Sequence, residues 1–464
     1  MTSRLFGSVS AACDKLHYGE WRGAWVSQGS KSWLADYARS TILSALKNSI
    51  SVGHIIISDS RGTTECGESR QDYDTSIRLK VVRDVFWVRV LMSGDVGFSE
   101  AYMFGDIELN DLNGAIKFFI DNHAQVNEVS SFLKHLRSAV SAGFNGLFGQ
   151  SLSQARLNAI SSYDQSNELF KAFLSQEMMY SCGLWSKLEG GVRGDLEGWR
   201  SPGDLEAAQL RKIHHVLTKA RVRPGHRILE FGSGWGAMAI EAASFFGCEV
   251  DTLTLSVEQK KLAEERVAAA GLSDKIRVHL MDYRDIPESF RNAFDAFVSI
   301  EMLEHVGSQY YDTYFKLVDF ALKKKNATVV VSSSTFPECR YREYQAEDFM
   351  RKYMWPNSCL PSATALVQAA LSGSSGNLTI ESIENHAAHY PRTLREWGRR
   401  LDEDLTQDRV IQDFPALQDP VEYQTFKRKW EYLFAYAGAG FAKGYITCHM
   451  LSFSRPGDVP MDCD

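Results

Sequence analysis

The stretch R-I-L-E-F-G-S-G-W-G, residues 227–236, joins a short apolar run to three closely spaced glycines. A second run, V-D-T-L-T-L-S-V-E-Q, follows at residues 250–259. An apolar run that ends in an acidic residue and then breaks into glycines is typical of a buried parallel strand turning sharply into a helix, the place where α/β folds bind nucleotides. Gly232, Gly234 and Gly236 remove side chains that would hold the backbone away from a ligand, and they allow positive φ. We therefore expect a nucleoside-containing cofactor here.

The spacing of these glycines narrows the class of cofactor. The dinucleotide fingerprint is G-x-G-x-x-G and a phosphate-binding loop needs a lysine, whereas this motif is G-x-G-x-G without a lysine. The pattern disfavours NAD and ATP and is usual for S-adenosylmethionine methyltransferases. The alternative is a glycine turn that only packs a helix against a strand.

The overall composition is that of a globular protein without a nucleic-acid partner. The 464 residues are 44% hydrophobic and 12% aromatic, which is ample for two or three packed domains. The formal net charge is -7, and nucleic-acid binding depends on neutralising phosphates. A membrane-surface role would need local basic patches. The alternative interpretation of each basic cluster is an ordinary solvated surface. The candidates are residues 323–325, the cluster Arg392, Arg395, Arg399 and Arg400, and residues 427–429.

The cysteines and the apolar runs indicate the cellular compartment of the protein. Eight cysteines are scattered without C-x-x-C pairs, so we expect neither a metal site nor a disulfide framework. No apolar run approaches the length of a spanning helix, and the first residues, M-T-S-R-L-F-G-S-V-S, lack the apolar core of a secretory signal. We expect a cytoplasmic protein, with an organelle-targeting peptide in the first dozen residues as the alternative.

The N-terminal part predicts a small α+β unit. Residues 1–40 show no strong periodicity and are expected to form a peripheral segment. In residues 41–125, the runs S-V-G-H-I-I-I-S, S-I-R-L-K-V and F-W-V-R-V-L are typical of short strands, and L-N-G-A-I-K-F-F-I-D-N is typical of an amphipathic helix. Residues 126–160, rich in serine, alanine and glycine, are expected to form a helical, partly flexible linker.

The remaining residues, 161–464, alternate between strand and helix patterns. Strands are expected at R-I-L-E-F, C-E-V-D-T-L-T, I-R-V-H-L-M, F-D-A-F-V-S-I and T-V-V-V-S-S, with helices at about 236–246 and 257–270. This alternation predicts an α/β, Rossmann-like class I methyltransferase fold with a largely parallel sheet. Its ligand is expected at the carboxyl ends of the strands.

From about residue 161 onward the chain resembles the cyclopropane fatty acid synthases and mycolic acid cyclopropane synthases, a family of S-adenosylmethionine-dependent methyltransferases that act on lipid double bonds. The residues around 94–105 also resemble the lipid-associated domain of the longer members. The matching segments in this sequence are S-Y-D-Q-S-N-E-L-F-K-A-F-L (162–174), M-M-Y-S-C-G-L-W (178–185), A-Q-L-R-K-I (208–213), E-F-G-S-G-W-G (230–236), T-L-S-V-E-Q (254–259), D-Y-R-D (282–285), E-M-L-E-H-V-G (301–307), Y-M-W-P-N-S-C-L-P-S (353–362), H-Y-P-R-T-L-R-E-W (389–397) and F-S-R-P-G (453–457).

The resemblance implies a set of residues that line the S-adenosylmethionine site. The residues themselves suit these roles, since glycines admit the amino-acid end, hydroxyl and amide groups suit a ribose, and a tyrosine offers a flat face to adenine. For the arginine of this set, a solvated loop charge is the alternative. The set is Tyr180, Ser181, Gly232, Gly234, Thr254, Gln259, Tyr283 and Arg284.

The resemblance also implies the reaction. A lipid alkene attacks the sulfonium methyl, a carbocation forms on the acyl chain, and loss of a proton from the new methyl closes a cyclopropane. The pocket must exclude water and stabilise the cation with fixed dipoles or aromatic faces.

The family's base is thought to be a bound bicarbonate, held by a cysteine, a glutamate, a histidine, a tyrosine and a backbone group. The matching residues are Cys182, Glu304 and Tyr390. Taken singly, each residue has an ordinary structural alternative: Cys182 as a small buried apolar residue, Glu304 as a helix-capping carboxylate and Tyr390 as a core aromatic. Within the recovered order of motifs we assign them to catalysis.

One position departs from the family. Ser332 stands where the family usually has a histidine, and Ser334 stands at a nearby isoleucine position. A serine hydroxyl is a shorter donor and cannot carry positive charge beside an anion. Bicarbonate binding is therefore expected to be weakened, and a misplaced base would leave a methyl- or methylene-branched chain in place of a ring.

The sequence thus predicts an enzyme that forms a cyclopropane on an unsaturated phospholipid at a membrane surface, as a homodimer by family resemblance. A first rival is a related methyltransferase that makes a branched product or acts on a nonlipid alkene such as a terpenoid or polyketide. A second rival is a lipid-binding scaffold with a silent catalytic domain.

Overall fold

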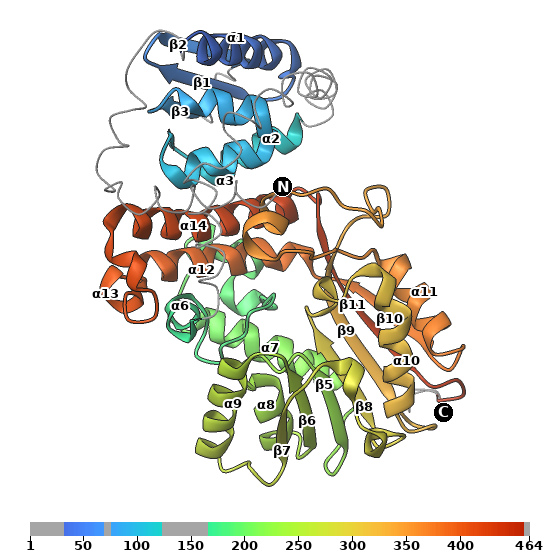
Figure 1. The fold of residues 1–464 in the computed structure, drawn as a ribbon. Helices are drawn as coiled ribbons and strands as arrows, with labels where there is room; N and C mark the ends of the chain where they lie inside the picture. Colours follow the sequence, from blue (N-terminus) through green and yellow to red (C-terminus); the bar gives the residue numbers. More distant parts are fainter. Residues whose placement is uncertain (1–31, 69–75, 123–165, 459–464) are drawn as a thin grey trace, which may run out of the picture.

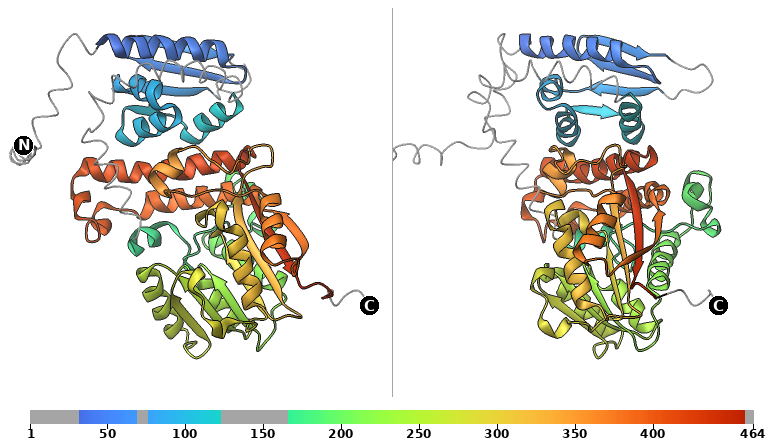
Figure 2. Two further views of the ribbon diagram at one scale, coloured as in Figure 1. Left: turned by 45° about the vertical axis from the view of Figure 1, so that its right-hand side comes forward. Right: turned by 90° about the vertical axis from the view of Figure 1, so that its right-hand side faces the viewer.

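The computed structural model describes residues 32–68, 76–122 and 166–458, which form two units (Figure 1). The smaller, N-terminal unit lies against one side of two long helices, α12 (Tyr390–Asp404) and α14 (Pro420–Ala442), and the larger sheet lies on their other side. Figure 2 shows the same order of layers from two further directions.

Within the described residues the larger sheet has the strand order β10-β11-β9-β8-β5-β6-β7. The strands from β9 to β7 are parallel, and β11 runs antiparallel to both of its neighbours. The chain leaves β5 toward β6 on one side and returns to β8 on the other, so the strand order reverses at β5, where open α/β sheets bind their ligands. The strands are β5 (Arg227–Phe231), β6 (Glu249–Thr254), β7 (Ile276–Leu280), β8 (Ala296–Ile300), β9 (Thr328–Thr335), β10 (Thr379–Asn385) and β11 (Thr447–Ser454).

Helices cover both faces of this sheet, which explains why its strands are apolar on both sides. Ile228 packs into one core with α7, α8 and α9, while Leu229 and Phe231 pack into a second core with α10 and α11. A parallel strand buried on both faces has the near-continuous apolar pattern of R-I-L-E-F. The predicted α/β fold with a largely parallel sheet is confirmed. The remaining helices of this unit are α6 (Asn167–Phe173), α7 (Asp204–Lys219), α8 (Ala237–Ser244), α9 (Val257–Ala269), α10 (Tyr311–Ala321), α11 (Ala363–Gly373) and α13 (Gln407–Val410).

The N-terminal unit is a small α+β arrangement with sheet order β2-β1-β3-β4. The hairpin of β1 and β2 is antiparallel, β3 runs parallel to β1, and β4 runs antiparallel to β3. Two of its predicted strands, at 51–58 and 76–81, correspond to β1 and β3. The elements are α1 (Ser32–Ser49), β1 (His54–Asp59), β2 (Gly62–Gly67), β3 (Ile77–Val81), α2 (Val85–Phe104), β4 (Ile107–Leu109) and α3 (Leu112–Asp121).

The strand predicted at 86–91 is wrong, because these residues begin α2. Their aromatic and β-branched side chains favour a strand locally. Phe86 and Trp87 are instead buried in the core of the unit, and that burial outweighs the local preference. α2 is interrupted at Gly94, whose φ of 58° and ψ of -124° are not helical.

The two units share one hydrophobic core and several polar contacts. The phenol of Tyr102 on α2 donates to Glu431 on α14 at 2.9 Å, and the Asn113 amide on α3 donates to the carbonyl of Ala435 at 3.1 Å. A buried contact joins the Tyr353 hydroxyl to the Glu100 carboxylate at 2.6 Å. The N-terminal unit is therefore packed onto the larger one along α14.

The arginine cluster considered as a basic patch is an internal ion-pair network. Arg392 is fully buried, and its guanidinium donates to Asp204 at 3.0 Å. Arg395 and Arg399 both donate to Asp195, and Arg400 pairs with Glu206. These charges are neutralised within the protein, so the cluster does not provide a membrane patch.

Two further sequence expectations concern the boundaries. Helix α1 begins at Ser32, so it crosses the boundary drawn at residue 40. The linker expected at residues 126–160 lies outside the described residues, as does most of the segment 1–40. Among the helices of the described residues, none is long and apolar enough to cross a bilayer.

Candidate active site

The glycine loop after β5 forms one end of a large cavity. Gly232 and Gly234 have φ of +92° and +48°, the left-handed region that glycine reaches without strain. The N–H groups of Gly232 and Ser233 both donate to the carbonyl of Leu253 on β6, which fixes the loop across the strand ends. A Cβ built on Gly234 would meet no protein atom within 4 Å, so the space beside this glycine is open to a ligand.

The cavity has a volume of about 1610 Å³ and reaches from this loop to the N-terminal unit. All of the residues assigned to S-adenosylmethionine line it, as the strand-end rule predicts. The structure thus brings together residues from four separate parts of the sequence: Tyr180, Ser181, Gly232, Gly234, Thr254, Gln259, Tyr283 and Arg284.

The polar members of this set already interact with one another or with neighbours. The Thr254 hydroxyl donates to the Gln259 amide oxygen at 2.8 Å at the carboxyl end of β6. Tyr283 lies beside Phe231, with ring centroids 5.6 Å apart. The guanidinium of Arg284 forms two hydrogen bonds to the Asp282 carboxylate and remains exposed. Arg284 thus lines the cavity, but its charge is neutralised by Asp282.

Two ionisable residues that sequence reasoning missed lie at the same end of the cavity. Lys212 on α7 is buried, and its ammonium donates to the Ser181 hydroxyl at 2.5 Å; burial lowers the pKa of Lys212 to about 8. Glu230 ends β5, and burial raises its pKa to about 8. One Glu230 carboxylate oxygen and the Ser233 hydroxyl are buried without a hydrogen-bond partner beside the cavity. The unpartnered oxygens of Glu230 and Ser233 offer hydrogen-bond acceptors to the ammonium group of a ligand.

A second polar group lies deeper, where β8 and β9 end. Glu301 follows β8 directly, and its carboxylate accepts hydrogen bonds from the Cys182 N–H at 2.9 Å and from the Tyr390 hydroxyl. Glu304 accepts a hydrogen bond from the Ser334 N–H at 2.5 Å, and its other oxygen has no hydrogen-bond partner. Glu301, Glu304 and Tyr390 all line the cavity.

The two glutamates differ in charge. Burial, together with the negative charge of Glu301, raises the pKa of Glu304 to about 8, so Glu304 is mostly protonated at neutral pH. Burial also raises the pKa of Glu301, while its two hydrogen-bond donors and the nearby Lys212 act in the opposite direction. Two adjacent buried carboxylates do not both ionise readily, and the one with more donors holds the charge. We conclude that Glu301 ionises before Glu304 as the pH rises.

The remaining assigned catalytic residues lie behind the cavity wall. The Cys182 thiol contacts the carbonyls of Gly183 at 3.4 Å and His386 at 3.9 Å, so only the backbone N–H of Cys182 reaches Glu301. Ser332 is buried on β9 and pairs with Met450 across the sheet. Its carbonyl accepts the Glu301 N–H at 2.8 Å. Cys182 and Ser332 thus contact Glu301 through backbone groups, and the side-chain roles expected for them stay predictions.

Apolar and polar side chains together form the rest of the cavity lining. Tyr390 stacks flat on Phe441, with ring centroids 4.1 Å apart and planes 8° apart. Beyond this pair the lining includes apolar residues from α12 and α14, charged residues of the segment 340–352 such as Arg340, Asp348 and Lys352, and residues from the N-terminal unit. The latter include Ile42, Leu46, Val90, Leu91, Val96, Phe98, Ile116, Phe119 and Ile120.

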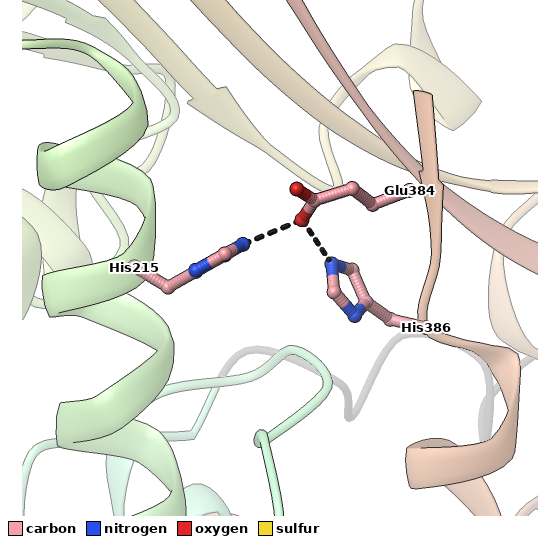
Figure 3. Close-up of side chains that lie close together, drawn as sticks. All are labelled: His215, Glu384 and His386. Carbon is pink, nitrogen blue, oxygen red and sulfur yellow. Dashed lines mark hydrogen bonds and ion pairs between the residues drawn. The ribbon is translucent and has the colours of Figure 1, made fainter. Parts of the chain in front are cut away.

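Among the described residues, one group of possible metal ligands lies outside the cavity, between α7 and β10 (Figure 3). A single Glu384 oxygen lies 2.5 Å from Nε2 of His215 and 3.2 Å from Nε2 of His386. Lys219 pairs with the other oxygen of the same carboxylate. Because the protein already supplies a cation to Glu384, we interpret the group as a polar contact that joins the helix to the sheet edge.

The strand order, the glycine loop and the cavity define a class I S-adenosylmethionine-dependent methyltransferase. Residues 150–451 match the family described as mycolic acid cyclopropane synthetase, and the chain belongs to this family. It is 32% identical over 371 residues to the tuberculostearic acid methyltransferase UfaA1 of Mycobacterium tuberculosis (strain ATCC 25618 / H37Rv), covering 80% of this chain and 81% of that protein.

Two further comparisons agree with this assignment. The cyclopropane-fatty-acyl-phospholipid synthase of Escherichia coli (strain K12) is 29% identical over 378 residues, with 81% of this chain and 87% of that protein covered. The solved structure of the mycolic acid cyclopropane synthase CmaA1 complexed with SAH and CTAB superposes with a TM-score of 0.50 at 23% identity, over 64% of this chain and 98% of that one. At this identity the structural likeness supports the fold.

Proposed function

We propose that this enzyme adds the methyl carbon of S-adenosylmethionine to a double bond of an unsaturated fatty acyl chain in a phospholipid, and that loss of a proton then closes a cyclopropane. The observation that carries the proposal is the single cavity that runs from the glycine loop to the apolar wall of the N-terminal unit. A cavity of this extent has room for a polar cosubstrate and a long apolar chain end to end, which supports the proposal.

The residues at the glycine end fit S-adenosylmethionine. Gly232 and Gly234 admit the methionine part, and the unpartnered oxygen of Glu230 provides an acceptor for its ammonium group. Thr254 and Gln259 supply partners for ribose hydroxyls, and Tyr283 supplies a face for adenine. When bound, S-adenosylmethionine supplies an electrophilic methyl group on a sulfonium.

The surrounding side chains protect the cation that forms on the acyl chain. An isolated alkene is a weak nucleophile, so attack requires an oriented and dry site. Tyr390, Phe441, Trp355 and Trp397 contribute aromatic rings to the cavity, and the faces of such rings stabilise a nearby cation. The negative charge of Glu301 lies in the same region and favours the cationic intermediate.

The proposal is tested with labelled S-adenosylmethionine and liposomes of a defined unsaturated phospholipid. The expected result is label in the acyl chain and a mass gain of about 14 Da, one methylene unit. Liposomes of the saturated phospholipid are the matched control and should gain no label. Label in no acyl chain contradicts the proposal, and label in a soluble terpenoid or polyketide alkene alone favours the nonlipid rival.

A second product is favoured by one observation. Ser332 stands where the family usually has a histidine, and the relative UfaA1 is named a tuberculostearic acid methyltransferase. A base in a different position can remove a different proton, which leaves a methyl- or methylene-branched chain. Proton NMR of the extracted product separates the outcomes, because ring protons and an exocyclic methylene resonate in different regions.

We also propose that the enzyme works in the cytoplasm at the membrane surface, from which the acyl chain must enter. Trp33 and Tyr37 on α1 are 61% and 44% exposed, and such aromatics are favoured at lipid interfaces. Sedimentation with liposomes should recover the wild-type protein, and the double variant Trp33→Ser/Tyr37→Ser should stay in the supernatant. Equal recovery of both proteins would contradict this surface.

The homodimer implied by the family resemblance remains a proposal for the full chain. Sedimentation equilibrium of the full-length protein should give twice the mass of the 464-residue chain. A single monomeric species over the assayed concentrations contradicts it.

A further inference from the structure

The donors that the family resemblance assigns to a bicarbonate already bind protein carboxylates in this structure. The Tyr390 hydroxyl and the Cys182 N–H both donate to Glu301. The backbone N–H of Ser334 donates to Glu304. The Cys182 thiol is directed at the carbonyls of Gly183 and His386. A bicarbonate would have to displace Glu301 from its donors in order to bind in the expected place.

The charges around the site also disfavour an additional anion. The negative charge of Glu301 already disfavours ionisation of the neighbouring Glu304, and it would likewise repel an additional anion. Ser332 cannot supply the positive charge of an imidazolium. Lys212 is the cation that acts on Glu301, and it lies against Ser181. The residues present therefore do not fit a bicarbonate.

The geometry points to Glu301 as the base of this enzyme: its carboxylate stands in the place of bicarbonate and accepts the proton that leaves the acyl chain. This inference rests on the proposed function. It names a residue of the E-M-L-E-H-V-G segment, in which sequence reasoning assigned only the second glutamate.

The local backbone supports a dedicated role for Glu301. Its φ is +52°, a conformation that glycine adopts freely and other residues adopt at a cost. Its N–H is bonded to the Ser332 carbonyl, which holds this conformation at the end of β8. Such strained positions are concentrated at active sites, because the surrounding structure must enforce them.

The step balances without another reactant. The alkene π pair forms a C–C bond to the methyl carbon, and the electrons of the C–S bond stay on sulfur as S-adenosylhomocysteine forms. The Glu301 carboxylate then accepts a proton from the added methyl, and the released C–H pair forms the second C–C bond of the ring. Glu301 later releases the proton to solvent.

Three proteins test the inference: the wild type, Glu301→Gln and Glu301→Gly. The amide keeps the size of the side chain but cannot accept the proton, so kcat should fall by about 100-fold or more. The glycine variant fits the positive φ and vacates the donors of Tyr390 and Cys182. Added bicarbonate should therefore restore part of its rate. Glu265→Gln, an exposed carboxylate on α9, is the matched control and should keep the wild-type rate.

A binding measurement gives a readout other than turnover. With ¹³C-bicarbonate, NMR should show a bound signal for Glu301→Gly and none for the wild type. Titration with S-adenosylmethionine should give the same affinity for all of these proteins, which also verifies that the variants fold.

The outcomes separate this inference from the proposed function. Absence of acyl labelling by the wild type overturns the proposed function. Labelling that stops when bicarbonate is removed from wild-type assays, or that survives in Glu301→Gln at more than half the wild-type rate, overturns Glu301 as the base. Wild-type labelling that is independent of bicarbonate, together with loss in Glu301→Gln, supports it.

Discussion

Removing the Tyr390 hydroxyl tests how the site controls the charge of Glu301. In Tyr390→Phe the ring stays stacked on Phe441, at 4.1 Å and 8°, so the shape of the cavity is retained. The variant loses one of the two hydrogen bonds to the Glu301 carboxylate. A hydrogen bond to a charged group contributes about 1.5–3 kcal/mol, so kcat should fall about 10- to 150-fold if the full bond acts in the transition state.

The pH dependence gives the sharper result. The base is active when ionised, so activity is present above the pKa of Glu301 and is lost as pH falls through it. The Tyr390 hydroxyl stabilises the ionised form and lowers this pKa, against the effect of burial. Its removal should raise the pKa of Glu301 and move the acidic limb of kcat/KM to higher pH.

The assay measures labelled methyl transfer to unsaturated phospholipid between pH 5 and 9. Tyr423→Phe is the matched control, since it also loses a tyrosine hydrogen bond, a part-buried one to the carbonyl of Leu405, but lies outside the cavity. The control should lose some stability and keep the wild-type pH profile. An acidic limb that stays in place in Tyr390→Phe would refute the argument that this hydroxyl acts on Glu301.

Three further changes probe other parts of the molecule. Gly234→Ala puts a Cβ into open ligand space at a φ of +48°, so S-adenosylmethionine affinity measured by calorimetry should fall about tenfold or more; unchanged affinity contradicts the cofactor assignment. Glu304→Gln should reduce kcat by about 100-fold while cofactor affinity stays within about twofold, and equal losses in both contradict its place beside the reacting carbons. Although burial acts in the opposite direction, hydrogen bonds from Lys219 and His215 lower the pKa of Glu384 to about 2. The ionised Glu384 therefore stabilises the fold fully above about pH 4.5, and this stabilisation is lost toward pH 2. In urea titrations, the free energy of unfolding of Glu384→Gln should lack this acid-dependent part, which is about 1 kcal/mol after allowance for partial exposure. Wild-type and variant curves of unfolding free energy against pH that run parallel would contradict this.

The central sheet could be predicted from sequence because its signal is local. The run 227–231 is buried on both faces, so its apolar pattern alone identifies a strand, and the glycines after it specify the turn. The strand predicted at 86–91 failed for the opposite reason. Its apolar side chains are compatible with either structure, and packing against distant elements decides in favour of α2.

The polar site could be predicted only in part. Motif order correctly brought Glu304 and Tyr390 to one cavity. The role of Glu301 depends on a tyrosine 89 positions away and on a backbone N–H 119 positions away, which no local pattern records. Its place directly after a central parallel strand was the available signal. Lys212 was missed because a lysine on an amphipathic helix is ordinarily solvated, whereas this one is buried against Ser181.

The junction between the two units has a consequence for how such enzymes diversify. The far wall of the cavity comes from α1, α2 and α3, whereas the groups proposed to perform the chemistry come from the other unit, at its strand ends and at the start of α12. Mutations in those helices can therefore alter which acyl lengths are accepted without disturbing the reactive groups. On the proposed function, exchange of the segment that encodes α1, α2 and α3 between relatives is expected to change chain-length preference while the reactive groups stay the same.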